Sequence, residues 1–160
     1  MKIYTSYFYQ IRNFTPNFIP VSTCLSDPAW YRPPENKEYY IDKRGIVCGL
    51  RYEPLIVQRY CTKSCIGERS ICPFAIGDYN CELMPEYEQL LYYSVDKEKT
   101  LKAFEHCLNK FKKELNFKEE PIICLMVYEA PSNLCSERIA LQRFFQCQEL
   151  QIKGDNNGTN

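Results

Sequence analysis

The chain has 160 residues, and a domain of that size buries roughly 68–70% of its unfolded surface in one hydrophobic core. Lysine and arginine together number 20, as do aspartate and glutamate, so the formal net charge is zero. This balance excludes a strongly basic, histone-like protein, although it allows a local basic face. The chain lacks both a membrane-length apolar run and the apolar core of a signal peptide. We therefore predict a cytoplasmic protein that does not enter a membrane.

Two strands and a long irregular region are expected in the first third of the chain. Residues 2–8 and 18–24 are rich in aromatic and β-branched side chains, which is typical of strands. Residues 25–44 contain the only tryptophan, Trp30, and two adjacent prolines, and we expect them to form a folded lid. Residues 46–60 contain two strand-like patches, GIVCGL and LIVQRY, on either side of Pro54.

The second half of the chain predicts helices around one buried strand. A short helix is expected over residues 85–93 and a longer one over 97–115, with Asp96 as its N-cap. The almost continuously apolar run PIICLMVY, residues 121–128, is typical of a strand inside a parallel sheet. A helix over about 135–146 and a short strand over 149–153 complete a single α/β domain, residues 1–153, with a flexible tail at 154–160.

Polar side chains gather between the buried strand and the next helix, in residues 128–138. Ligands collect at the carboxyl ends of parallel strands, and a helix N-terminus favours anions and thiolates. We predict an anion site here, with Glu129 as a general base, Cys135 as a nucleophile and Arg138 as an anion ligand. The alternative is structural: Ser132 or Ser136 caps the helix, Glu137 complements its dipole, and Glu129 pairs with Arg138.

The same residues resemble the domain-of-unknown-function 488 family of bacteria. Its members typically end a buried strand with Cys/Tyr-Glu, as in Tyr128-Glu129, and open the next helix with Cys-His-Arg, as in Cys135 to Arg138. IYTSYF and IPVSTCLSDPAW resemble the family's first two strands and the loop that follows them. The resemblance implies a Rossmann-like three-layer sandwich with a mostly parallel sheet. Ser136 replaces the family's histidine, and one extra residue precedes Arg138, so an imidazole role is not carried over.

The ten cysteines are unusual for a chain expected in a reducing compartment. Four of them, Cys61, Cys65, Cys72 and Cys81, lie in a cysteine-rich insertion over about 61–81 and could hold structural zinc or an iron–sulfur cluster. Only Cys61-x3-Cys65 approaches the usual zinc spacing, so buried or unlinked thiols are the alternative.

Two functions follow from these patterns. The first is a nucleotide- or nucleic-acid-related enzyme or binding domain, in which aromatic side chains stack on bases. Its substrate-binding residues would be Tyr4, Ser6, Ser22, Trp30, Tyr128 and Ser136, facing Glu129, Cys135 and Arg138. The second is a non-catalytic module that binds a protein or a nucleic acid and is stiffened by the metal site.

Overall fold

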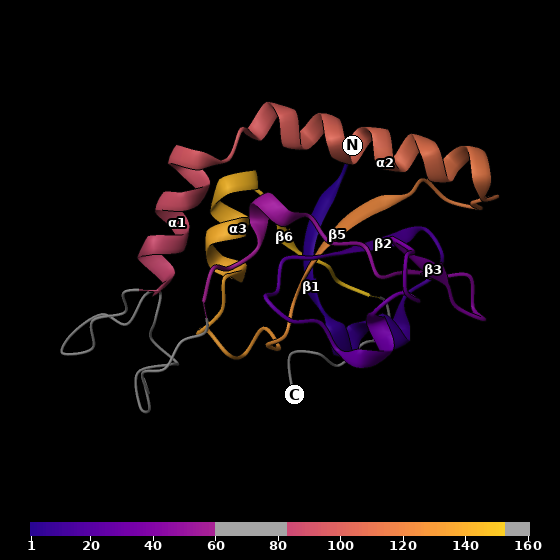
Figure 1. The fold of residues 1–160 in the computed structure, drawn as a ribbon, viewed down its shortest axis with the longest axis horizontal. Helices are drawn as coiled ribbons and strands as arrows, with labels where there is room; N and C mark the ends of the chain where they lie inside the picture. Colours follow the sequence, from indigo (N-terminus) through magenta and orange to yellow (C-terminus); the bar gives the residue numbers. More distant parts are fainter. Residues whose placement is uncertain (60–82, 153–160) are drawn as a thin grey trace.

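The computed structural model describes residues 1–59 and 83–152, which fold as a mixed α/β protein (Figure 1). The elements are, in chain order, β1 (Ile3–Tyr7), the 3₁₀ helix η1 (Phe8–Asn13), β2 (Phe18–Ser22), η2 (Ala29–Tyr31), β3 (Tyr40–Ile41), β4 (Val47–Cys48), η3 (Glu53–Leu55), α1 (Leu83–Ser94), α2 (Lys97–Glu114), β5 (Ile122–Val127), α3 (Arg138–Phe145) and β6 (Gln148–Glu149). The predicted cysteine-rich insertion and the predicted tail lie outside the described residues.

Four strands form a sheet of order β2-β5-β1-β6, and every neighbouring pair is parallel. A separate antiparallel pair joins β3 and β4. All six residues of β5 are buried, as expected for an apolar strand with a neighbour on each side. The sequence prediction of an interior parallel strand at 121–128 is thus confirmed.

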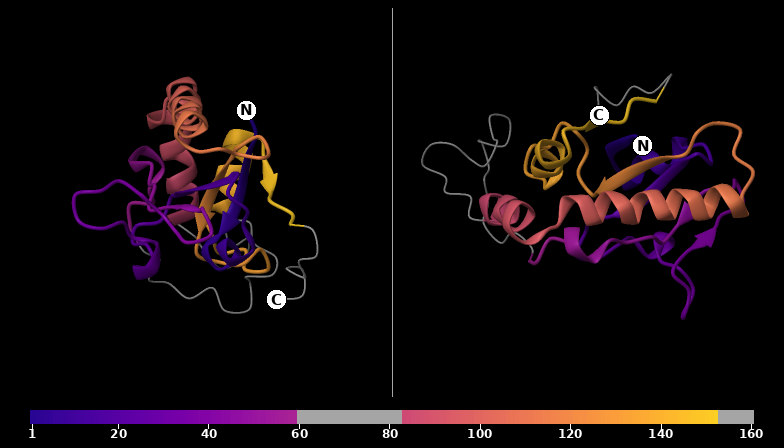
Figure 2. Two further views of the ribbon diagram at one scale, coloured as in Figure 1. Left: turned by 90° about the vertical axis from the view of Figure 1, so that its right-hand side faces the viewer. Right: turned by 90° about the horizontal axis from the view of Figure 1, so that it is seen from above.

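The two faces of the sheet are covered differently. The α-helices pack on one face, where Phe104 of α2 and Leu141 of α3 share a core with Leu125. Figure 2 shows these helices beside the sheet, and Figure 1 shows α1 alongside α3. The opposite core surrounds Cys124 and Met126 and is closed by side chains from η1, η2 and β4 instead of an α-helix of the described residues.

Helix α2 matches its prediction closely. The carboxylate of Asp96 accepts a hydrogen bond from the backbone N–H of Lys99 at 3.0 Å, which is N-cap geometry. The apolar stripe of the helix packs through Phe104, Leu108 and Phe111 into the core beside β5. Spacing of three and four residues therefore predicts both the element and its buried side.

Two other predictions need correction. The patch LIVQRY does not form a strand within its described residues: Glu53–Leu55 is a 3₁₀ turn, because Pro54 has no N–H to donate to a ladder. The helix expected from residue 135 begins at Arg138, so Cys135 and Ser136 lie in the preceding loop. The loop folds on itself there, with the N–H of Cys135 donating to the Asn133 side chain.

The chain leaves the two central strands toward opposite faces. After β1 it enters η1, whose Phe8 and Ile11 belong to the core around Met126. After β5 it leads to α3, whose Leu141 belongs to the core on the helical face. Adjacent parallel strands with connections on opposite faces leave a crevice beyond their carboxyl ends, the usual place of a ligand site in such sheets.

None of the helices in the described residues has the length and apolar character needed to cross a membrane.

Candidate functional site

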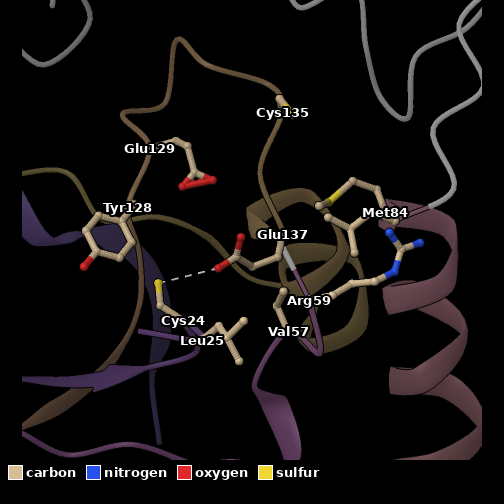
Figure 3. A pocket seen from close by; sticks show the side chains of 10 residues that line it. Cys24, Leu25, Val57, Arg59, Met84, Tyr128, Glu129, Cys135 and Glu137 are labelled. Carbon is tan, nitrogen blue, oxygen red and sulfur yellow. Dashed lines mark hydrogen bonds between the residues drawn. The ribbon is translucent and has the colours of Figure 1, made fainter. Parts of the chain in front are cut away.

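A pocket of about 310 Å³ lies beyond the carboxyl ends of β2 and β5 (Figure 3). This volume is at the lower end of the range of small-molecule sites. We call it the corner pocket, and its lining residues are Cys24, Leu25, Val57, Arg59, Leu83, Met84, Tyr128, Glu129, Cys135 and Glu137. The prediction placed a site at this corner, and three of its residues, Tyr128, Glu129 and Cys135, line the pocket.

Glu137 is the most perturbed acid of the corner pocket. It is buried at the N-cap position of α3, where its backbone carbonyl accepts the first helical hydrogen bond, from Leu141. Burial, together with the neighbouring charge of Glu129, raises the pKa of Glu137 from 4.5 to about 7. A carboxyl group with that pKa exchanges a proton near neutrality and can serve as acid or base.

Glu129 is the second acid, and it lies two residues after the end of β5. Burial raises its pKa, against the opposing effects of Arg138 and of a hydrogen bond from the Ser136 side chain. Figure 3 shows the carboxylates of Glu129 and Glu137 both directed into the corner pocket. Two acids that disfavour each other's ionisation tend to hold one proton between them.

Cys24 and Thr23 reach Glu137 from the end of β2. The Sγ atom of Cys24 lies 3.7 Å from Oε1 of Glu137, and the Thr23 hydroxyl lies 3.4 Å from the same atom. Burial and three nearby carboxylates raise the pKa of the Cys24 thiol, so it stays a neutral donor. The two residues that follow β2 therefore hold the Glu137 side chain in place.

Arg138 lies beside the corner pocket but does not line it. Its Nε donates to Oε1 of Glu149 at 2.7 Å, and its Nη1 and Nη2 donate to the backbone carbonyls of Ala130 and Glu129. The side chain is only 6% exposed. These hydrogen bonds anchor the loop that follows β5. Arg138 therefore contacts Glu149 and the backbone of Glu129, and it does not face the corner pocket as the predicted anion ligand.

Ser136 and Cys135 take different positions in the loop. Ser136 is buried; its hydroxyl donates to Glu129 and accepts the N–H of Arg138 at 3.2 Å. Ser136 therefore lies one residue before the N-cap of α3, which is Glu137, and it does not line the corner pocket. Cys135 is half-buried and borders the corner pocket without lying on the helix terminus.

The other predicted binding residues do not line the corner pocket. Tyr4 pairs with Cys124 near the opposite end of the sheet and borders another hollow. Ser6 is fully buried, and its hydroxyl has no hydrogen-bond partner among the described residues. The hydroxyl of Ser22 donates to Asp27, which pairs with Arg51 at 2.8 Å.

Trp30 is half-exposed and lies against Phe8, which also contacts Tyr128. It is thus connected to the rim of the corner pocket through one buried ring. The predicted lid, residues 25–44, does contain folded elements at η2 and β3.

The predicted metal ligands Cys61, Cys65, Cys72 and Cys81 lie outside the described residues. Within residues 1–59 and 83–152, no group of three or more histidine, cysteine, aspartate or glutamate side chains is arranged to hold a metal ion.

Sequence reasoning treated Cys24 only as a possible substitute metal ligand and gave Glu137 only a structural role. The signal for Glu137 was its position one residue before a helix that follows a buried strand. Cys24 follows β2 as Glu129 follows β5, and β2 and β5 are paired in parallel. Because the two strands are parallel neighbours, their carboxyl ends lie side by side, and Cys24 and Glu129 therefore reach the same pocket.

No protein-family model, curated protein or solved structure matches the chain. The class that the geometry defines is a mixed α/β protein with a carboxyl-lined pocket at the carboxyl ends of parallel strands.

Proposed function

We propose that the protein is a cytoplasmic, nucleotide-related enzyme whose corner pocket binds a nucleobase and exchanges a proton with it through Glu129 and Glu137. One observation carries the proposal: two carboxyl groups with raised pKa values face the same small pocket. Pairs of acids whose surroundings alter their protonation near neutrality are typical of acid–base catalysts.

The chemistry of the pocket favours a base over other small ligands. A protonated carboxyl group offers one donor and an acceptor, while an ionised one only accepts. A pair that holds one proton therefore complements the mixed donors and acceptors on a base edge. Leu25, Val57 and Met84 supply apolar walls, and the half-exposed ring of Tyr128 offers a stacking surface.

The phosphate of a nucleotide is better placed outside the pocket. Glu129 and Glu137 would repel it, and the nearest guanidinium groups already have carboxylate partners. Arg59 pairs with Glu86 at 2.9 Å and Arg138 pairs with Glu149 at 2.7 Å. We therefore propose that the phosphate does not bind at the N-terminus of α3, where the sequence predicted an anion site over residues 128–138.

The Rossmann-like three-layer arrangement and the relation to the domain-of-unknown-function 488 family belong to the same proposal. The parallel sheet and its opposite-facing connections support the arrangement. In it, η1, η2 and the β3–β4 pair would form the third layer. The Tyr128-Glu129 pair that follows β5 supports the relation to the family, since it occupies the place of the family's Cys/Tyr-Glu motif.

Ligand-observed NMR with the four common ribonucleosides tests the proposal. We expect at least one to bind the wild type and to bind Glu129→Gln and Glu137→Gln at least tenfold more weakly. Glu98→Gln is the matched control, because Glu98 is an exposed residue of α2. Equal binding by all variants, or no binding at millimolar nucleoside, would contradict the proposal. Binding without conversion over hours would favour the non-catalytic module.

A further inference from the structure

Exposed aromatic side chains lie next to the corner pocket. Tyr9, Trp30 and Tyr128 are 59%, 52% and 48% exposed, although large aromatic side chains usually bury most of their area. They follow β1, β2 and β5 in the chain, and these parallel strands are neighbours in the sheet order β2-β5-β1. Exposed rings gathered on one part of a surface commonly mark a site where a ligand or another molecule binds.

Two of the three rings, those of Trp30 and Tyr128, contact the buried side chain of Phe8. Its ring centroid lies 5.2 Å from that of Tyr128 and 6.3 Å from that of Trp30. Phe8 also packs edge-on to the buried Tyr31, at 5.0 Å. The rings of Trp30 and Tyr128 thus rest on a fixed base, and binding would cost them little conformational freedom.

Two arginines accompany these rings. The guanidinium of Arg12 lies 3.9 Å from the centroid of the Tyr9 ring. Arg32 follows η2 and donates to the Asp27 carbonyl and to the Ser26 hydroxyl, both uncharged acceptors. Neither guanidinium forms an ion pair within the part of the chain that the structure describes.

This distinguishes them from the other arginines. The remaining arginines of the described residues each pair with a carboxylate: Arg44, Arg51, Arg59, Arg138 and Arg143. The two arginines without a carboxylate partner among the described residues therefore adjoin exposed rings, since Arg12 lies over Tyr9 and Arg32 directly follows the η2 turn that carries Trp30. Such a surface suits a ligand with both negative charge and flat apolar faces.

We propose that Tyr9, Arg12, Trp30, Arg32 and Tyr128 form a binding surface for single-stranded nucleic acid, with its phosphates on the arginines and its bases on the rings. Aromatic platforms interleaved with cations are how proteins bind single strands without reading sequence. The surface extends to the corner pocket through Tyr128, which borders both. The inference rests on the proposed function in one respect: the nucleobase in the corner pocket would be part of the bound single-stranded nucleic acid.

Tryptophan fluorescence tests the surface directly, because Trp30 is the only tryptophan of the chain. We expect a 12-nucleotide single strand of deoxythymidylate to quench it, and inorganic polyphosphate of equal charge to quench much less. Absence of quenching at low salt, or equal quenching by polyphosphate, would overturn the inference. So would quenching that grows with protein concentration alone, since the surface would then join two copies of this chain.

Variants are compared by the fluorescence anisotropy of a labelled strand. Trp30→Leu and Tyr9→Leu should each weaken binding about fivefold or more. Arg12→Gln and Arg32→Gln should each lower the slope of log affinity against log salt by about 0.7. Tyr93→Leu, a change of an 88% exposed ring on α1, and Arg143→Gln should leave binding unchanged. Equal effects in the test and control variants would overturn the inference.

The two proposals fail separately. If Glu129→Gln loses nucleoside binding but binds the single-stranded nucleic acid as the wild type does, the result supports the role of the corner pocket and leaves the aromatic surface unaffected. A wild type that binds nucleosides but no single strand would refute the surface and leave the proposed function standing.

Discussion

Arg138 on α3 and Glu149 on β6 form a buried ion pair with an Nε–Oε1 distance of 2.7 Å. The same guanidinium donates to the carbonyls of Glu129 and Ala130, and Glu149 also accepts from the Thr5 hydroxyl at 2.8 Å. The pair thus links the last strand, the first strand and the loop that carries Glu129. Arg138 therefore positions the loop that carries Glu129 without lining the corner pocket itself.

Replacement of Arg138 by methionine should destabilise the fold by about 3–5 kcal/mol, because Glu149 would keep a buried charge without its partner. Urea unfolding at pH 7 measures this loss. Arg143→Met is the matched control, since Arg143 is an exposed residue of the same helix. A loss below about 0.5 kcal/mol in Arg138→Met would show that the guanidinium is available for a ligand instead.

The stability of the protein should depend on pH through Glu137. Its pKa is about 7 in the folded state and near 4.5 when exposed, so the folded state binds the proton more tightly. Stability should therefore be greatest below pH 4.5 as far as Glu137 is concerned, and should fall as pH rises to about 7. The expected contribution is on the order of 3 kcal/mol.

Glu137→Gln should remove this dependence, because glutamine stays neutral at every pH. The variant should match the wild type near pH 5 and exceed it in stability at pH 8, as measured by urea unfolding at both values. An identical pH profile in both proteins would mean that Glu137 ionises without cost in the folded state.

The sequence predicts elements better than it predicts contacts. The apolar run of β5 and the spaced stripe of α2 each specify their own burial, and both predictions are confirmed. The partners of Arg138 and Glu137 depend instead on which strands lie side by side. Cys24 and Glu137 are separated by 113 residues, and no local pattern joins them.

A local competition explains why helix α3 begins later than predicted. Cys135 and Ser136 are compatible with a helix, but Asn133 and Ser136 bind nearby backbone N–H groups and hold the segment in turns. Asparagine and serine commonly compete with helix formation in this way. A pattern of residue types does not reveal which of these two outcomes the tertiary structure selects.

Cys135 should react with iodoacetamide before the buried thiols of the described residues. It is half-buried at the corner pocket, whereas Cys24 and Cys124 are buried and burial raises their pKa values. Peptide mass spectrometry at pH 7 gives the order of labelling, and the urea-unfolded protein serves as the control in which the thiols become alike. Labelling of Cys135 no faster than Cys124 would end its candidacy as a nucleophile.

Replacement of Asp96 by alanine should lower stability by about 1 kcal/mol, because the N–H of Lys99 loses its acceptor. Thermal unfolding should show a Tm lower by roughly 2–4 °C. Asp96→Asn is the control, since asparagine also caps helices well. Equal losses in both variants would assign the effect to charge instead of capping.

Elemental analysis of the anaerobically purified protein tests the predicted metal site. If Cys61, Cys65, Cys72 and Cys81 bind zinc or iron, about one equivalent of zinc or a full cluster should accompany the chain, and serine at these positions should remove it. Less than about half an equivalent of either metal would exclude the site.

The most direct measurement is a carbon-13 NMR titration of the glutamate carboxyl groups, with Glu129→Gln and Glu137→Gln used for assignment. We expect one carboxyl signal to titrate near pH 7, to disappear in Glu137→Gln, and to shift to lower pH in Glu129→Gln, because the neighbouring charge is then gone. If every glutamate titrates below about pH 5, the corner pocket holds no proton near neutrality and the acid–base function is wrong.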